Sequence, residues 1–595
     1  MPSSLPPPSK KRKLQQSQTT KEIQRLEQEL TDAISANASL NSLADLVDLA
    51  SRLSDPRDCS KAIYALYRVS VTLISGGKLE VDGTEAAAAV RTWIRDQMNR
   101  YVNLLGALLQ HEEKTIRVSA LQILLSLQKH LSSSISAPSK PQFHVSHFKK
   151  VVSFLLLGPP GKPSPIDPDV LHEFHEKWFS ENDDIRWFLL REAATLLNAH
   201  PEAHDLPINL LTILQSLTTF PTEQSELNSW WVPELGAKPP KPKKVKGSAD
   251  EDSDADEAKP AEGDMDDGDD DWRKFFDDEP TEKDGKTLAA TARLHSLTIH
   301  QSLHSLSSHR AVFTRAWLAL LPRLNVRGDP ALSRALAVRA LNVMHRGVLP
   351  HLTRAVLVMD WIAACVDYGG APGLLALNAL FILMKEYNLD YPFFYKRLYT
   401  FLDRDVLHLK HRARFFRMTE VFLSSTHLPA TLLASFIKRL ARLSLNAPPA
   451  AIVMIIPFTY NILKRHPKLM PMIHRSDYDG TDEDPFLAEE FDPQQTNALA
   501  SSLWELSTHR QHYHAGVSTL AKIFSEAFTK PSYAMEDFLD HTYGTLFETE
   551  AKRKIKKEPA LAIDIGKNLD GLFPVAQEDR PTLEGGVVQD LWVFA

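Results

Sequence analysis

The sequence predicts an all-α protein, with HEAT- or armadillo-like helical repeats in two domains that a disordered acidic linker joins. Three observations support this fold class. Apolar residues recur at spacings of three and four, as at Leu43, Leu46 and Val47, which places them on one face of a helix. We find no sustained alternation of period two, the pattern that predicts a strand. A Lys/Pro-rich and then acidic stretch interrupts the helical pattern near the middle of the chain.

Length and composition restrict the class of protein. The chain has 595 residues, too many for one hydrophobic core, so at least two domains are expected. Cys59 and Cys365 are its only cysteines, which excludes a disulfide framework and a cysteine-based zinc site and fits a reducing compartment. The longest apolar runs are much shorter than the roughly 20 residues that a membrane helix needs. We therefore expect a soluble protein without membrane contact.

Residues 1–20 are predicted to form a disordered basic arm. The opening residues MPSSLPPPSKKRKL lack the apolar core of a secretory signal. Lys10, Lys11, Arg12 and Lys13 stand in Pro- and Ser-rich surroundings, which is typical of a nuclear localisation signal. A solvated basic tail without a targeting role is the alternative.

Residues 21–232 are predicted to form an N-terminal helical-repeat domain. Two of its segments, Thr115 to Leu124 and Asp184 to Leu190, resemble each other. Each follows acidic residues that suit a helix N-terminus, and each has an Arg directly after an Ile that we expect to be buried. This opening is typical of the second helix of a HEAT-type repeat, a unit that stacks on its neighbours. A generic helical bundle is the alternative.

Residues 233–286 are predicted to form the disordered linker. Residues 250–271 hold 13 acidic residues and a single Lys, Lys259. They contribute −12 to a net charge of −7, so the rest of the chain is basic, at +5. Such a stretch cannot bury enough apolar surface to offset its chain entropy. Near its end Trp272, Phe275 and Phe276 form a candidate docking motif for a partner or for the C-terminal domain, with chance aromatics in a spacer as the alternative.

Residues 287–550 are predicted to form a C-terminal helical domain with basic faces, followed by a basic cluster and an extended tail over 551–595. At about 100° per residue, Leu433, Phe436 and Leu440 share one arc of a helix, and Lys438 lies on the opposite arc. The candidates for binding RNA or a protein partner are Lys410, Arg414, Arg417, Lys438, Arg439, Arg442, Lys464 and Arg465. A positive surface of this kind suits RNA phosphates. Solvated helix faces carry the same residues, and that reading stays open.

The sequence shows no signature of an enzyme site. It has no nucleophile elbow and no dinucleotide-binding fingerprint. His172 to Glu176 do not have the spacing of a zinc protease motif. His295, His300, His304 and His309 recur at short intervals but lack matching carboxylates and cysteines. We therefore expect no catalysis, no cofactor, no metal and no small-molecule substrate.

Several motifs in the C-terminal half agree with one known family. They are VLPHL (Val348 to Leu352), DYGGAPGLLALNALFILMKEYNLDYPFFYKRLYTFL (Asp367 to Leu402), KHRARFFRM (Lys410 to Met418), LPATLLASFIKRLARLSLNAPP (Leu428 to Pro449) and YNILKRHP (Tyr460 to Pro467). Together they resemble the CCAAT-binding-factor domain of the nucleolar complex proteins. Phe491 to His514 is similar to the corresponding part of one member, and the resemblance covers about Phe313 to Phe547.

The resemblance implies a non-enzymatic scaffold in the nucleus and nucleolus, for small (40S) ribosomal subunit biogenesis and 18S rRNA maturation. It implies nucleolar protein 14 and other small-subunit processome proteins as partners, and it leaves direct contact with pre-rRNA open. Two other functions stay as alternatives. A DNA-binding transcription factor would need a recognition helix with several base-reading side chains, and a nuclear transport adaptor built on a helical solenoid would bind under the control of a small GTPase.

Overall fold

The computed structural model describes residues 10–79, 85–137, 140–158, 165–239, 298–326, 328–391, 393–408, 412–475 and 483–554. These residues form helices and loops without a strand, and an isolated bridge joins Ala137 to Lys140. The all-α prediction is therefore confirmed over the described ranges. Contacts divide the chain into two compact units, Met1–Phe401 (unit 1) and Leu402–Ala595 (unit 2).

The α-helices of unit 1 are α1 Lys10–Ala36, α2 Ser42–Arg52, α3 Pro56–Ser75, α4 Glu85–Leu108, α5 Lys114–Ile135, α6 Val145–Leu156, α7 Pro168–Phe174, α8 Asp183–Ala199, α9 Asp205–Gln215, α11 Ile299–Leu303, α12 Leu306–Leu320, α13 Pro330–Val343, α14 Met359–Val366, α15 Gly370–Glu386 and α16 Phe394–Thr400. Those of unit 2 are α17 Arg412–Leu423, α18 Ala430–Ser444, α19 Pro449–Arg465, α20 Trp504–Thr508, α21 Ala515–Ala521, α22 Glu536–Leu539 and α23 Tyr543–Lys552. The short η helices are η1 His175–Phe179, η2 Gln224–Glu226, η3 Pro233–Gly236, η5 Leu321–Leu324, η6 Met344–Val348, η7 Leu349–His351, η8 Ala355–Val358, η9 Asp405–Leu407, η10 Pro467–Met472, η11 Ala498–Ala500, η12 His509–Gln511 and η13 Lys522–Ser525.

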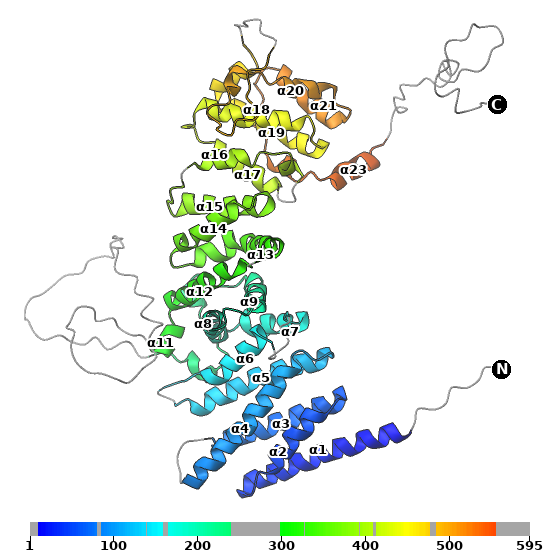
Figure 1. Ribbon diagram of the computed structural model, residues 1–595, viewed down its shortest axis with the longest axis vertical. Helices are drawn as coiled ribbons and strands as arrows, with labels where there is room; N and C mark the ends of the chain where they lie inside the picture. Colours follow the sequence, from blue (N-terminus) through cyan, green and yellow to red (C-terminus); the bar gives the residue numbers. More distant parts are fainter. Residues whose placement is uncertain are drawn as a thin grey trace, which may run out of the picture. The chain divides into compact units, whose positions relative to one another are not determined.

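The first helices of unit 1 pack in two rows. Helices α1, α3, α5 and α7 contact one another in turn, and α2, α4 and α6 form the second row (Figure 1). From α1 to α6, helices that follow each other in the sequence pair across the two rows. Each pair thus buries apolar side chains against the next, which is the packing of helical-repeat proteins. Helix α1 begins at Lys10, earlier than the predicted start at residue 21.

The two similar segments lie at the start of α5 and α8. Ile116 and Ile185 are both fully buried, which confirms the prediction for the Ile that precedes each Arg. Arg117 forms ion pairs of 3.1 Å with Asp167 and 2.8 Å with Asp169, at the start of α7. Its guanidinium therefore ties α5 to the next helix of its row.

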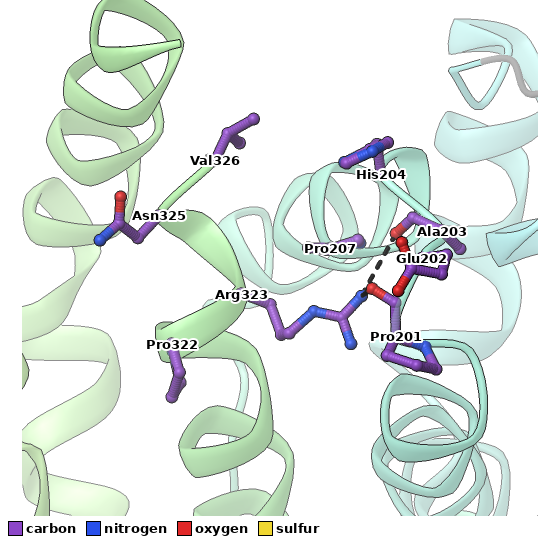
Figure 2. A pocket seen from close by; sticks show the side chains of 9 residues that line it. All are labelled: Pro201, Glu202, Ala203, His204, Pro207, Pro322, Arg323, Asn325 and Val326. Carbon is purple, nitrogen blue, oxygen red and sulfur yellow. Dashed lines mark hydrogen bonds between the residues drawn. The ribbon is translucent and has the colours of Figure 1, made fainter. Parts of the chain in front are cut away.

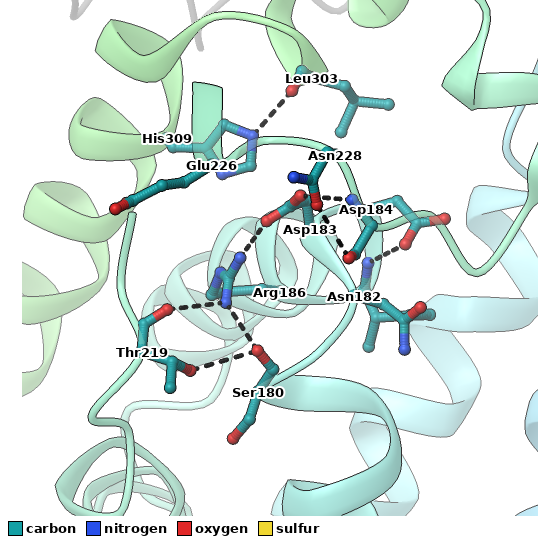
Figure 3. Close-up of polar contacts among 12 residues, drawn as sticks. Ser180, Asn182, Asp183, Asp184, Arg186, Thr219, Glu226, Asn228, Leu303 and His309 are labelled. Atoms are coloured by element: carbon teal, nitrogen blue, oxygen red, sulfur yellow. Dashed lines mark hydrogen bonds and ion pairs between the residues drawn. The ribbon is translucent and has the colours of Figure 1, made fainter. Parts of the chain in front are cut away.

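Two acidic residues at the N-terminus of α8 hold a later loop in place (Figure 3). Asp184 has no exposed surface, and its carboxylate accepts the backbone N–H groups of Trp231 and Val232 at 3.1 and 3.0 Å. Asp183 forms a buried ion pair with Arg186 and accepts the N–H of Ser229 at 3.2 Å. A carboxylate at a helix N-terminus also meets the positive end of the helix dipole, so this contact fixes residues 229–232 to α8.

The residues on both sides of 240–297 belong to unit 1. The carbonyl oxygen of Leu235 accepts hydrogen bonds from His300 Nε2 at 3.2 Å and His304 Nε2 at 2.7 Å. Trp230 stacks on His304 with ring centroids 4.4 Å apart, and α8 packs along α12. The contact boundary between the units thus lies at 401/402, whereas the sequence predicts a domain division at 233–286. Residues 240–286 of the predicted linker lie outside the described ranges.

A second tie joins α8 to the segment that follows residue 297 (Figure 2). Arg323 of η5 donates to the carbonyl oxygens of Leu197 at 2.9 Å, His200 at 3.1 Å and Pro201 at 2.5 Å. The last carbonyls of a helix lack intrahelical partners and form the negative end of its dipole. The guanidinium therefore stabilises the end of α8, beside a small hollow of about 340 Å³.

The buried carboxyl of Asp184 should make the stability of unit 1 depend on pH. Burial raises the pKa of Asp184 from 3.8 to about 6, although its backbone N–H donors act in the opposite direction. Since the pKa is higher in the folded chain, the contribution of this group is fullest below about pH 4 and is lost as the pH rises through 6. Between about pH 4.5 and 7.5 the loss is roughly 2 kcal/mol.

Thermal unfolding of the wild type and of Asp184→Asn at both pH values checks this prediction. Because Asn does not titrate, we expect the stability deficit of the variant relative to the wild type to shrink at the higher pH. Asp205→Asn, in the first turn of α9, serves as the control for a general charge effect. A deficit that stays constant between the two pH values would contradict the assignment.

Candidate interaction surfaces

Helix α19 forms the centre of unit 2. Its side chains are buried on every side from Ala450 to Leu463, as expected of a helix surrounded by other elements. Helices α17 and α18 contact it, as do α21 and α22. Pro449 lies in the first turn of α19. Backbone N–H groups in a first turn have no acceptor within the helix, so the N–H that proline lacks costs no hydrogen bond there. The surfaces of unit 2 are therefore formed by the helices around α19.

The polar arc of α18 is covered by residues 483–505. Lys438 has no exposed surface, and its Nζ lies 2.7 Å from Glu505 Oε1 and 2.9 Å from Asp484 Oδ2. It also donates to the carbonyl oxygen of Ser502 at 2.7 Å. Arg442 forms a longer ion pair, with its Nε 3.5 Å from Glu505 Oε1. Its guanidinium lies 5.7 Å from the ring centroid of Trp504.

The ionisation of these carboxylates follows from their surroundings. Burial acts to raise the pKa of Asp484, but hydrogen bonds from Ser501, Lys438 and Trp504 hold it at about 2. Burial raises the pKa of Glu505, with Lys438 acting in the opposite direction. The prediction that Lys438 lies on a solvent-facing arc is wrong. The arc opposite the apolar face is not exposed, because a later segment of the chain covers it and supplies two carboxylates.

Several of the other predicted basic residues that the structure describes have acceptors within unit 2. Arg439 Nε donates to the carbonyl oxygen of Leu402 at 2.7 Å, and Arg414 is half-buried. Arg417 forms a two-pronged ion pair with Glu536 of α22. Lys464 donates to the carbonyl oxygen of Lys530.

One group of cations is more exposed. Arg465 at the end of α19 and Lys468 in η10 both lie on the surface. With the half-buried Lys464 they form what we call the α19 basic end. Lys410 lies outside the described residues, as do Trp272, Phe275 and Phe276 of the docking motif. The backbone of Lys10 to Lys13 opens α1, and their side chains lie outside the description.

An open apolar groove lies between α19, α21, α22 and α23. Its volume is about 850 Å³, and Val453, Leu520, Phe538 and Leu546 line it. Helix α23 buries none of its residues, and Phe547 is 76% exposed. Exposed apolar surface with a polar rim is typical of a protein-binding site. The sequence pattern does not predict this groove, because its lining residues come from several helices between Val453 and Arg553 and no local spacing connects them.

None of the helices in the described ranges combines the length and the apolar character needed to cross a bilayer. Within the same ranges no three His, Cys, Asp or Glu residues are grouped to hold a metal ion.

Known families match both units. Residues 373–521 match the CBF/Mak21 family, and residues 12–202 match the family described as nucleolar complex protein 4-like, TPR repeats. The nucleolar complex protein 4 homolog of Mus musculus is 31% identical and covers 92% of this chain and 94% of its own length. The Homo sapiens homolog is 31% identical over 89% of this chain and 91% of its own length. Nucleolar complex protein 4 of Saccharomyces cerevisiae is 42% identical over 45% of this chain and 52% of its own length.

These matches confirm the resemblance found in the sequence and extend it to the N-terminal helices. TPR repeats, like the predicted HEAT- or armadillo-like repeats, are stacked helix pairs. The predicted location in the nucleus and nucleolus is confirmed, and so is the class of helical-repeat scaffold in ribosome biogenesis. With relatives above 30% identity over nine-tenths of its length, the chain belongs to the nucleolar complex protein 4 family.

Proposed function

We propose that the chain is a non-enzymatic assembly factor of the small (40S) ribosomal subunit, which acts in the small-subunit processome and is needed for 18S rRNA maturation. The observation that carries the proposal is the open apolar groove of unit 2, together with membership of a nucleolar family. A groove of this kind binds a partner protein and has no need of catalytic groups. The groove of unit 2 therefore supports a role in holding a partner protein.

The groove supports a helical protein partner. An amphipathic helix binds such a groove through apolar residues three and four positions apart. Leu520, Phe538 and Leu546 line the groove. Lys552 and Arg553, which form ion pairs with Glu548 and Glu550, give it a polar rim. We propose nucleolar protein 14 as the partner that fills it, with other processome proteins bound through it.

Contact with pre-rRNA is assigned to the α19 basic end. Arg465 and Lys468 are exposed there, and cations at a helix C-terminus are also stabilised by the helix dipole. Phosphate contacts of this kind are independent of sequence and sensitive to salt. Lys438 takes no part, because it is fully buried.

The geometry of α18 does not favour a DNA-binding transcription factor. A recognition helix presents three or four side chains to base edges. In α18 Lys438 is buried, and Arg439 and Arg442 are directed onto acceptors within unit 2.

Depletion of the protein tests the proposal. We expect the level of 18S rRNA to fall several-fold while large-subunit rRNA is spared, because the factor acts on one subunit only. Affinity purification of the full chain should recover nucleolar protein 14 and processome proteins. Normal 18S rRNA after depletion would refute the proposal, and capture governed by the nucleotide state of a small GTPase would indicate a transport adaptor.

A further inference from the structure

A cavity in unit 1 combines cations with an apolar wall. It lies between α4, α5 and α6, far along the chain from the groove and the α19 basic end, and its volume is about 460 Å³. Ligand pockets typically measure roughly 300–1,000 Å³ and are mostly apolar with a few polar groups. Arg95, Lys150 and His144 line it, and no carboxylate is among its lining residues. The cavity therefore suits a ligand that carries a negative charge.

Both cations are held by uncharged acceptors. Arg95 Nη2 donates to the carbonyl oxygen of Leu79 at 2.9 Å, and Lys150 Nζ donates to Asn99 Oδ1 at 2.7 Å. A guanidinium has five N–H donors and an ammonium group has three, so each keeps donors for a ligand. In the described part of the chain neither side chain forms an ion pair. The hydrogen bonds therefore hold the side chains of Arg95 and Lys150 in place, but no carboxylate of the described residues neutralises their positive charges.

His144 provides a third donor. Its Nδ1 accepts the backbone N–H of His147 at 3.2 Å, so the proton of the neutral ring is on Nε2. Burial lowers the pKa of His144, and the positive charges of Arg95 and Lys150 lower it further. The ring is therefore neutral at pH 7 and still offers one N–H at Nε2.

The wall beside these donors is apolar. Met98, Val102 and Leu131 line it and are 7%, 4% and 8% exposed. A nucleotide joins a phosphate to a flat ring with apolar faces, and this combination matches three donors beside an apolar wall. We propose that the cavity binds a nucleotide, with the phosphate held by Arg95, Lys150 and His144 and the base against Met98, Val102 and Leu131. The nucleotide is either free or part of a single-stranded RNA, and the site goes beyond the surfaces assigned to unit 2.

Binding of a labelled oligouridine to the full chain tests the inference. We expect Arg95→Gln with Lys150→Gln to weaken the affinity, measured by fluorescence anisotropy, about tenfold or more, because two charge-assisted contacts with phosphate are lost. The matched control is Arg57→Gln with Lys149→Gln, which removes the same charge from two exposed positions that do not line the cavity, and it should change the affinity by less than about twofold. Equal losses in both variants, or no binding of oligouridine or UMP to the wild type, would overturn the proposal.

Two further arms locate the site and identify the source of the nucleotide. Photocrosslinking with 4-thiouridine should give adducts on peptides between residues 95 and 150. Adducts confined to unit 2 would overturn this proposal while leaving the proposed function intact. Competition by UMP at concentrations similar to oligouridine indicates a free nucleotide, and much weaker competition indicates an RNA residue; both support the site. Competition by a phosphoserine peptide without competition by UMP would refute it.

Discussion

Replacing Lys438 by Met should destabilise unit 2 by about 3–5 kcal/mol, the cost of removing one partner from a buried ion pair. The substitution keeps the volume and removes the charge, so Glu505, with no exposed surface, loses its closest cation. Asp484 loses a partner at 2.9 Å as well. Arg442, at 3.5 Å from Glu505, cannot replace both contacts. Denaturant unfolding of the full chain measures the loss, and hydrogen exchange should show residues 483–505 opening first.

Two variants distinguish the loss of the buried ion pairs of Lys438 from a general effect of removing a positive charge. Arg417→Met removes a cation whose ion pair with Glu536 is about half exposed on both sides, and it should cost less than about 1 kcal/mol. Adding Glu505→Gln to Lys438→Met removes the uncompensated buried charge and should recover part of the stability. If Lys438→Met unfolds no more easily than Arg417→Met, the ion pairs of Lys438 with Asp484 and Glu505 do not hold residues 483–505 against α18.

In helix α18 the sequence pattern predicts the buried apolar face but not the burial of the opposite face. Its apolar arc is buried as predicted at Leu433, Phe436 and Leu440. Periodicity separates two faces of a helix, but it does not tell whether another element covers the second face. The carboxylates that meet Lys438 come from residues 46 and 67 positions later, Asp484 and Glu505. No local spacing links such residues, so the burial of Lys438 could not be predicted.

At the N-terminus of α8 in unit 1, the local pattern likewise predicts the helix but not its contacts with a distant segment. The acidic residues followed by Ile and Arg correctly indicated a helix start and a buried Ile185. They did not indicate that Asp184 accepts N–H groups from Trp231 and Val232, because those donors belong to an irregular loop. The composition change after residue 232 predicts a domain division there, whereas the contact boundary lies at 401/402. Composition shows which residues cannot form a core, and it does not show that the flanking helices α8 and α12 pack together.

Filling the groove of unit 2 by Thr519→Arg should reduce the affinity for the proposed partner, nucleolar protein 14, about 30-fold or more, the effect of losing a central contact of about 2 kcal/mol. Thr519 is exposed on α21 and lines the groove, so a long side chain there occupies the space of a partner helix. The side chain of Thr519 bonds only to the carbonyl oxygen of Ala515 within its own helix, and Arg has a higher helix propensity than Thr. The fold should therefore be preserved, and binding measured with purified proteins reports on the groove.

The matched control is Thr431→Arg, the same substitution at an exposed position in the first turn of α18, outside the groove. It changes the charge of unit 2 equally, so it should leave the affinity within about twofold if apolar burial, and not charge, carries the interaction. Leu546→Ala, which removes an apolar side chain of α23 from the lining of the groove, should weaken binding in the same direction as Thr519→Arg. Unchanged affinity in both groove variants would exclude the groove as the binding site, and equal losses in Thr431→Arg and Thr519→Arg would indicate a non-specific effect of the added charge.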